Sequence, residues 1–189
     1  MSTARKRVGV LALQGDFRAH RKALEQAGAD AVEIRTARQL DGIDGLILPG
    51  GESTTMLKLL DEEALFEPLR RFGQHKPIFG TCAGAILLAT EVTNPAQRSL
   101  GLMDMTVERN AYGRQLDSRI VTLPWNGSGV EAVFIRAPII RRTGAGVQAV
   151  AFYGNSPVLV FAGQHIAATF HPELTPDPRI HRFFLEKVP

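Results

Sequence analysis

Short apolar segments alternate with helical segments through roughly the first half of this 189-residue chain, and glycine-rich turns separate many of them. Short, wholly apolar segments are typical of strands that are covered on both faces. Parallel neighbours in a sheet need a crossover connection, which is usually a helix. The alternation therefore predicts an α/β fold, a three-layer sandwich with a mostly parallel central sheet.

The pattern gives the expected elements in order. Strands are expected at residues 8–13, 31–34, 45–48 and 76–79, and helices at 17–27, 53–60, 63–73 and 84–90. From about Gly101 the pattern changes to short alternating segments, which predicts antiparallel hairpins or edge strands. These segments are 103–108, 118–123, 132–135, 147–153, 157–162 and 164–170, followed by a helix at 177–187. No linker or repeat divides the chain, so a single domain over residues 1–189 is expected.

The strand expected at 76–79 runs directly into Gly80-Thr81-Cys82-Ala83-Gly84. A Gly-x-nucleophile-x-Gly turn holds the nucleophile in a sparsely allowed backbone conformation, so that its side chain projects into a cleft. A lone free cysteine is more often a small buried hydrophobe, so this turn leaves both roles open. Because Cys82 is the only cysteine, the chain has no internal disulfide, and a reducing, cytoplasmic location is expected.

Other chemically active residues follow expected strands, at the edge where open α/β sheets bind ligands. Gly50-Gly51 is either a plain turn or a pair of backbone donors for an oxyanion. A phosphate loop is disfavoured because Glu52 would repel phosphate. His171 supplies an imidazole that can take the thiol proton, and Glu173 supplies a carboxylate that can orient this imidazole. With Cys82 they complete a set of nucleophile, base and orienting acid.

Rival functions find little support. The histidines and Cys82 lack metal-ligand spacing, so no metal is expected, and His20 and His181 are interpreted as solvent-facing or packed helix residues without a role. The net charge of +3 comes from interspersed acidic and basic residues, so nucleic acid is not an expected partner. No apolar run is long enough for a membrane span. The apolar run after Arg7 could mimic a secretory signal, but Gln14 and Asp16 interrupt it, which favours a first strand.

The motifs GTCAG and HPE together resemble the class I, or triad, glutamine amidotransferases. The fuller set LALQGD, LILPGGESTTM, FGTCAG, ERNAYGRQ, FIRAP and FHPELT is similar to the family of glutaminase subunits that serve pyridoxal 5′-phosphate (vitamin B6) synthesis. The resemblance implies a flavodoxin-like class I glutamine amidotransferase fold. It also implies hydrolysis of L-glutamine to L-glutamate and ammonia without a cofactor, with Cys82 as nucleophile, His171 as proton carrier and Glu173 as its support.

The resemblance also implies roles for residues around this triad. The backbone N–H groups of Gly51 and Ala83 would form the oxyanion hole, with Gln14 beside it, helping to order it when a partner docks. Glutamine recognition would fall to Gly50, Gly51, Glu52, Arg109, Ile135 and Arg136. An amino acid substrate carries an ammonium and a carboxylate, which suit one acidic anchor and one or two basic anchors.

A partner is implied as well. The ammonia would pass through a tunnel to a separate synthase subunit, which condenses it with ribose 5-phosphate and glyceraldehyde 3-phosphate, in an assembly of twelve copies of each subunit. The glutaminase would be weak without that partner. Ala111-Tyr112 and residues 123–130 depart from the family pattern and leave partner contacts there open. Two alternatives remain: a related thiol hydrolase or redox-responsive protein of similar fold, and a non-catalytic regulatory domain.

Overall fold

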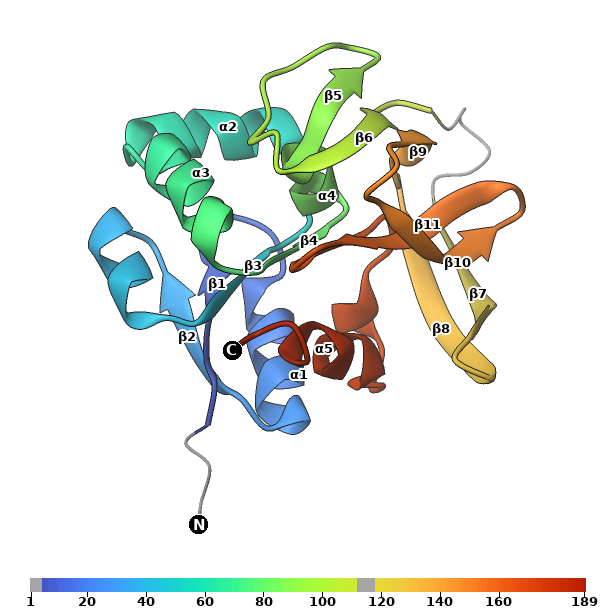
Figure 1. Ribbon diagram of the computed structural model, residues 1–189, viewed down its shortest axis with the longest axis horizontal. Coiled ribbons are helices and arrows are strands. Elements are labelled where there is room, and N and C mark those ends of the chain that lie inside the picture. The colour runs from blue at the N-terminus through green and yellow to red at the C-terminus, as the bar shows by residue number, and fades with distance from the viewer. Residues whose placement is uncertain (1–4, 112–117) are drawn as a thin grey trace.

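A seven-stranded sheet runs through the centre of the computed structural model, which describes residues 5–111 and 118–189 (Figure 1). Its strand order is β10-β11-β12-β4-β3-β1-β2. The pairs from β2 across to β12 are parallel, whereas β11 and β10 continue the sheet antiparallel. The bounds are β1 Arg7–Leu11, β2 Asp30–Ile34, β3 Gly45–Leu48, β4 Ile78–Thr81, β10 Gln148–Tyr153, β11 Ser156–Ala162 and β12 His165–Ala168.

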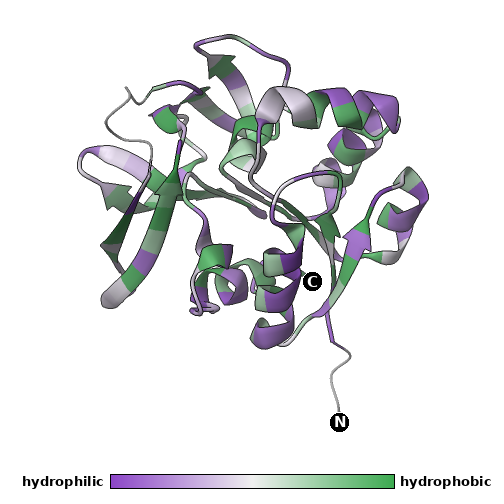
Figure 2. Ribbon diagram, turned by 180° about the vertical axis from the view of Figure 1, so that it is seen from behind, coloured by the Kyte–Doolittle hydropathy of each residue, from purple (hydrophilic) through white to green (hydrophobic). Residues whose placement is uncertain are grey.

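Helices cover both faces of this sheet and confirm the predicted α/β fold. In Figure 1, α1 (Phe17–Ala27) and α5 (Arg179–Leu185) lie on one face, and α2 (Ser53–Glu62), α3 (Phe66–His75) and α4 (Ala83–Leu88) on the other. Figure 2 shows apolar strands inside and hydrophilic helix surfaces outside. None of the helices in the described ranges has the length and apolar character needed to cross a bilayer.

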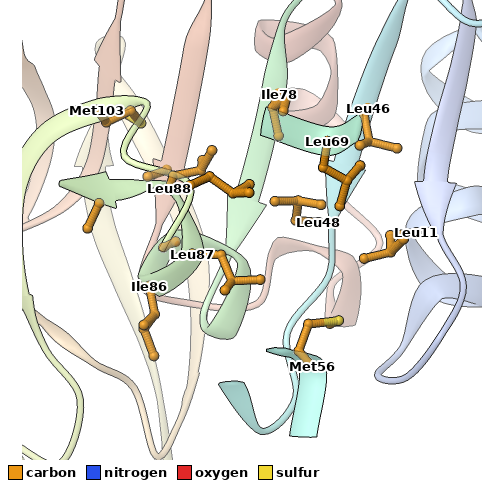
Figure 3. Close-up of a cluster of buried hydrophobic side chains, with 14 of the residues drawn as sticks. Leu11, Leu46, Leu48, Met56, Leu69, Ile78, Ile86, Leu87, Leu88 and Met103 are labelled. Carbon is orange, nitrogen blue, oxygen red and sulfur yellow. The ribbon is translucent and has the colours of Figure 1, made fainter. Parts of the chain in front are cut away.

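Two hydrophobic cores form because strand side chains alternate between the two faces. In β3, Ile47 packs into the core with α1 and α5, while Leu46 and Leu48 pack into the core with α2, α3 and α4. Figure 3 shows the second of these cores, in which Leu48 and Met56 lie near helix α4. Together, the two cores therefore hold the sheet and the helices on its two faces, including α1 and α4, which flank the end of β4.

Smaller elements complete the chain. A three-stranded sheet contains β5 (Ala89–Thr93), β6 (Met103–Glu108) and β9 (Ile139–Thr143), and β7 (Ser118–Trp125) pairs with β8 (Ser128–Ile135) as a hairpin. The 3-10 helices within residues 5–111 and 118–189 are η1 (Ala37–Gly42) and η2 (Pro172–Leu174).

The structure corrects several expected elements. The helix expected at 84–90 ends at Leu88, because the chain extends from Ala89 to form β5 beside β6. Strand β9 was not expected at all. The segment expected at 164–170 forms the predicted hairpin with β11, but it also lies inside the main sheet, parallel to β4. This position places the end of β12 next to the end of β4.

Candidate active site

Cys82 occupies the turn between β4 and α4, and its backbone is strained. Its dihedral angles are φ 49° and ψ −106°, a combination that costs a non-glycine residue about 1–3 kcal/mol. Two backbone hydrogen bonds hold the turn: the Cys82 N–H donates to Ala168 O at 2.9 Å, and Cys82 O accepts from the Ile86 N–H at 3.1 Å. The predicted elbow conformation is confirmed, and it is anchored on both sides.

The two flanking glycines allow close backbone contact. A Cβ atom at position 80 would lie 2.4 Å from Gly84 O, and one at position 84 would lie 2.0 Å from Leu48 O. Neither glycine has a positive φ, so what each position requires is the absence of a side chain. Helix α4 can therefore begin directly against β3 and β4.

His171 and Glu173 reach Cys82 because β12 pairs with β4. Ala168 lies opposite Thr81 in the register, so the chain leaving β12 passes beside the elbow. The backbone N–H of His171 donates to Val133 O at 2.8 Å, which ties this segment to β8. The His171 Nδ1 lies 2.7 Å from Glu173 Oε1, and both residues are buried.

The Gly50 turn packs against the same two side chains. A Cβ atom at position 50 would lie 2.5 Å from His171 Cε1 and 3.3 Å from Cys82 Cβ. The structure therefore brings together Cys82, Gly50 and the His171–Glu173 pair from three separate parts of the sequence.

Hydrogen bonds and nearby charges set the protonation states of His171 and Glu173. Burial lowers the pKa of His171, but hydrogen bonds with Cys82 and Glu173 and their negative charges outweigh burial and raise that pKa to about 10. Burial raises the pKa of Glu173, yet the nearby His20 and the hydrogen bond from His171 bring it below its usual range. At neutral pH His171 is therefore an imidazolium beside a carboxylate, with a proton available for a leaving group.

The residues expected around the oxyanion lie beside this group. Ala83 is the first residue of α4 and directly follows Cys82. Gly51 has a φ of +141°, which favours glycine, and a Cβ there would lie 2.9 Å from Gln14 Nε2. The Gln14 side chain donates to Glu52 O at 2.6 Å. The loop before α1 therefore packs on the Gly50-Gly51 turn, and the oxyanion role of Gly51, Ala83 and Gln14 stays a prediction.

Glu52 and Arg109 lie together at the start of α2. The Glu52 carboxylate caps this helix by accepting from the N–H groups of Thr54 at 3.0 Å and Thr55 at 2.7 Å. Partial burial raises its pKa, but these hydrogen bonds outweigh burial and lower it to about 2. The guanidinium of Arg109 lies 3.3 Å from the carboxylate and donates to Thr54 Oγ1 at 2.7 Å. This capping role was not predicted from the sequence, although an acidic residue directly before the helix expected at 53–60 could have suggested it.

Ile135 is the last residue of β8 and Arg136 follows it; β8 belongs to the hairpin that holds the His171 backbone through Val133. Ile135 is 39% exposed, and Arg136 adopts a positive φ of 44°. Their contact with glutamine stays a prediction. Residues 112–115 of the ERNAYGRQ motif lie outside the described residues. Within the described part of the chain, no group of three or more His, Cys, Asp or Glu side chains could hold a metal ion.

No role follows from the sequence for His20 or His181, and the structure buries both near Glu173. Both are fully buried, so the solvent-facing interpretation is wrong and the packed one is confirmed. The His20 Nε2 lies 3.4 Å from Glu173 Oε2. The helical spacing of His20 with Ala23 and Leu24, which are also buried, was the available signal of its burial.

Solved structures share this architecture. A glutamine amidotransferase crystal structure is 50% identical to this chain, with a TM-score of 0.89 over 95% of this chain and 97% of that chain. The PurLQS structure from Thermotoga maritima, at 18% identity, shares the fold, with a TM-score of 0.71 over 96% of this chain and 98% of that chain. The fold, together with a cysteine elbow and a His-x-Glu pair, defines the chain as a class I glutamine amidotransferase.

The family follows from the sequence comparisons. The chain belongs to the SNO glutamine amidotransferase family, whose model matches residues 10–189. It is 59% identical, over 97% of its length and 100% of the relative's, to the pyridoxal 5′-phosphate synthase subunit PdxT of Solibacter usitatus. It is 53% identical to the protein of the same name from Thermus thermophilus, over 95% of this chain and 96% of that relative.

Proposed function

We propose that this chain is the glutaminase subunit of a pyridoxal 5′-phosphate synthase and that Cys82, His171 and Glu173 carry its reaction. The observation that carries the proposal is the His171–Glu173 pair, 2.7 Å apart, held with Cys82 against the Gly50 turn. The relatives' name points to the use of the ammonia in vitamin B6 synthesis.

The first half of the reaction releases ammonia. The Cys82 thiolate attacks the carboxamide carbon of glutamine, and the C=O electron pair moves onto oxygen to give a tetrahedral oxyanion. The N–H groups of Gly51 and Ala83 stabilise that charge. The His171 imidazolium then protonates the amide nitrogen as the C–N bond breaks, which gives ammonia and a glutamyl thioester on Cys82.

The second half regenerates the enzyme. His171, now neutral, takes a proton from a water molecule that attacks the thioester carbon. The second oxyanion collapses and breaks the C–S bond, which yields glutamate and the Cys82 thiolate with His171 protonated again. The Glu173 carboxylate stays ionised throughout, because its task is to orient the ring and stabilise the imidazolium.

Substrate recognition falls to residues outside the triad. Gly50, Gly51, Glu52, Arg109, Ile135 and Arg136 are the residues inferred to bind glutamine. The Arg109 side chain is only 11% exposed and already faces Glu52, so the pair is held in place before substrate arrives. Guanidinium groups bind carboxylates bidentately, which fits Arg109 or Arg136 to the α-carboxylate of glutamine.

We further infer that the chain binds a synthase subunit and that it works in the cytoplasm. A synthase subunit receives the ammonia through a tunnel, in an assembly of twelve copies of each subunit, because ammonia released into neutral water becomes ammonium and loses its nucleophilicity. Cys82 must remain a free thiol, which favours the reducing cytoplasm.

Ammonia release tests this proposal. The purified chain is assayed with L-glutamine, with and without the synthase subunit, for ammonia and glutamate. Equal amounts of both products are expected, at a higher rate when the synthase is present, and sedimentation of the mixture should report a complex of twelve plus twelve chains. A mixture that forms the complex and releases no ammonia would contradict the glutaminase function and favour a redox-responsive or regulatory protein of the same fold.

Gly50→Ala is expected to lower the turnover of glutamine about 100-fold. The added methyl group would lie 2.5 Å from His171 Cε1, so the imidazole must move, and a shift of about 1 Å in a catalytic group costs roughly that factor. The measurement is kcat in the synthase complex. Gly42→Ala is the control, because a Cβ there meets nothing within 4 Å. Wild-type kcat in Gly50→Ala would contradict the packing of this turn against the triad.

A further inference from the structure

A buried polar cluster lies on the far side of Glu173 from His171, and the mechanism above does not use it. Its members are His20 of α1 and His181 of α5, both fully buried, together with Thr81 at the end of β4. The two imidazole rings pack against the Phe79 ring, with centroid distances of 6.4 Å and 6.0 Å. The cluster therefore joins α1, α5 and β4, the strand that ends directly before Cys82.

His20 is the centre of this cluster. Its Nδ1 lies 3.0 Å from His181 Nε2, and its Nε2 lies 3.1 Å from Thr81 Oγ1 and 3.4 Å from Glu173 Oε2. The two oxygens of Glu173 thus face different histidines, Oε1 facing His171 and Oε2 facing His20. Within the described residues Oε2 accepts no hydrogen bond, so the His20 Nε2 is the polar group that faces its charge.

These contacts fix the proton positions on both rings. Burial lowers the pKa of His20 despite the opposing charge of Glu173, and it lowers the pKa of His181 to about 3, so both rings are neutral. A bare nitrogen lone pair facing a carboxylate would be repelled, so the His20 Nε2 carries the hydrogen. The His20 Nδ1 must then accept from the His181 Nε2–H. This leaves His181 Nδ1 as the bare nitrogen, which agrees with its lack of a partner in the described ranges.

We propose that His20 is a positioning residue for the glutaminase reaction, acting through Glu173. Its Nε2–H dipole faces Glu173 Oε2, which keeps the buried carboxylate ionised and turns Oε1 toward His171. The same N–H faces the hydroxyl of Thr81, the residue before the nucleophile, and so links the acid to the elbow. His181 sets the tautomer of His20 in the way that an outer hydrogen-bond partner sets the tautomer of a functional histidine.

The position of α1 also connects the Gly50-Gly51 turn with Glu173. The helix begins directly after the loop of Gln14 and Gly15, and a Cβ atom at position 15 would lie 1.9 Å from Gly50 O. One rigid helix therefore contacts the Gly50-Gly51 turn with its leading loop and the acid of the triad with His20. A displacement of α1 would therefore disturb both the contact with the Gly50-Gly51 turn and the contact of His20 with Glu173.

The test compares two substitutions of similar size in the synthase complex. His20→Leu removes the N–H groups, whereas His20→Gln keeps an amide N–H that can reach Glu173 and Thr81. We expect His20→Leu to lower kcat for ammonia release about 10- to 100-fold with KM unchanged, by analogy with outer partners of metal-bound histidines. His20→Gln should restore most of that loss. Equal loss in both variants, or a change in KM alone, would contradict the proposal.

His165 provides a matched control for the loss of a buried histidine. It lies at the opposite end of β12 from the triad and accepts a hydrogen bond from the Ile78 N–H at 3.2 Å. His165→Leu should lower the thermal midpoint and leave kcat unchanged. If His165→Leu lowered kcat as much as His20→Leu, His20 would have only a structural role.

A spectroscopic readout on the wild-type chain does not depend on any variant folding. With ¹⁵N-labelled histidine, NMR should show neutral rings for His20 and His181, each with the proton on Nε2. A His20 ring with the proton on Nδ1 would overturn the proposal. The inference rests on the glutaminase function, and the outcomes separate: an inactive wild-type complex contradicts that function, whereas an active wild type with a fully active His20→Leu contradicts only the role of His20.

Discussion

Cys82→Ala is expected to lower glutamine hydrolysis by about 10⁴-fold or more. Removal of the nucleophile of a catalytic triad leaves only the contribution of the oxyanion hole and of substrate binding. No other thiol can replace it, because Cys82 is the only cysteine of the chain. The measurement is ammonia release in the synthase complex at saturating glutamine.

The same substitution should leave the fold and the partner interaction intact. Alanine is smaller than cysteine by one sulfur atom, and the backbone hydrogen bonds to Ala168 and from Ile86 do not involve that atom. Both residues bear the same strain at a φ of 49°. The thermal midpoint and sedimentation with the synthase are the controls. A folded, complexed Cys82→Ala variant that still released ammonia at the wild-type rate would refute the assignment of the nucleophile.

Gly84→Ala is expected to lower the free energy of unfolding by about 3 kcal/mol. Its Cβ would lie 2.0 Å from Leu48 O, and that oxygen belongs to the backbone of a buried central strand, so α4 would have to move away from β3. Overpacking of this kind commonly costs 1–3 kcal/mol and more where the neighbour is rigid, so roughly the top of that range applies. Urea unfolding followed by circular dichroism measures the change.

Gly146→Ala serves as the comparison for this experiment. A Cβ at that position meets nothing within 4 Å, so its free energy of unfolding should change by no more than about 0.5 kcal/mol. If Gly84→Ala and Gly146→Ala unfolded at the same urea concentration, the close contact between α4 and β3 would not be a constraint on the fold.

Local chemistry explains why some elements could be predicted from the sequence. Helix α1 has the predicted bounds, because Asp16 caps its start and Gly28 ends it in a left-handed conformation. The elbow was predictable for the same reason: its glycines and the apolar strand before it lie within a few residues. The resemblance to a known family supplied the activity. That residues 1–189 form a single domain stays a prediction, supported by the two cores on one sheet.

Tertiary contacts explain what could not be predicted. Whether the segment at Ala89 continues a helix or starts β5 depends on β6, which lies further along the chain. The burial of His20 against His181 depends on the packing of α1 on α5, from opposite ends of the sequence. Helical spacing shows that His20 is on an inner face, but it gives no information about which polar group it meets there.

The place of β12 has a consequence for how the protein is made. Its pairing with β4 joins segments more than 80 residues apart, with Ile166 opposite Phe79. Such non-local pairs form late, since the intervening loop must first be closed at an entropic cost. During translation, β4 and Cys82 are therefore synthesised long before His171 and Glu173. Ammonia release should begin only once the C-terminal strands have inserted into the sheet.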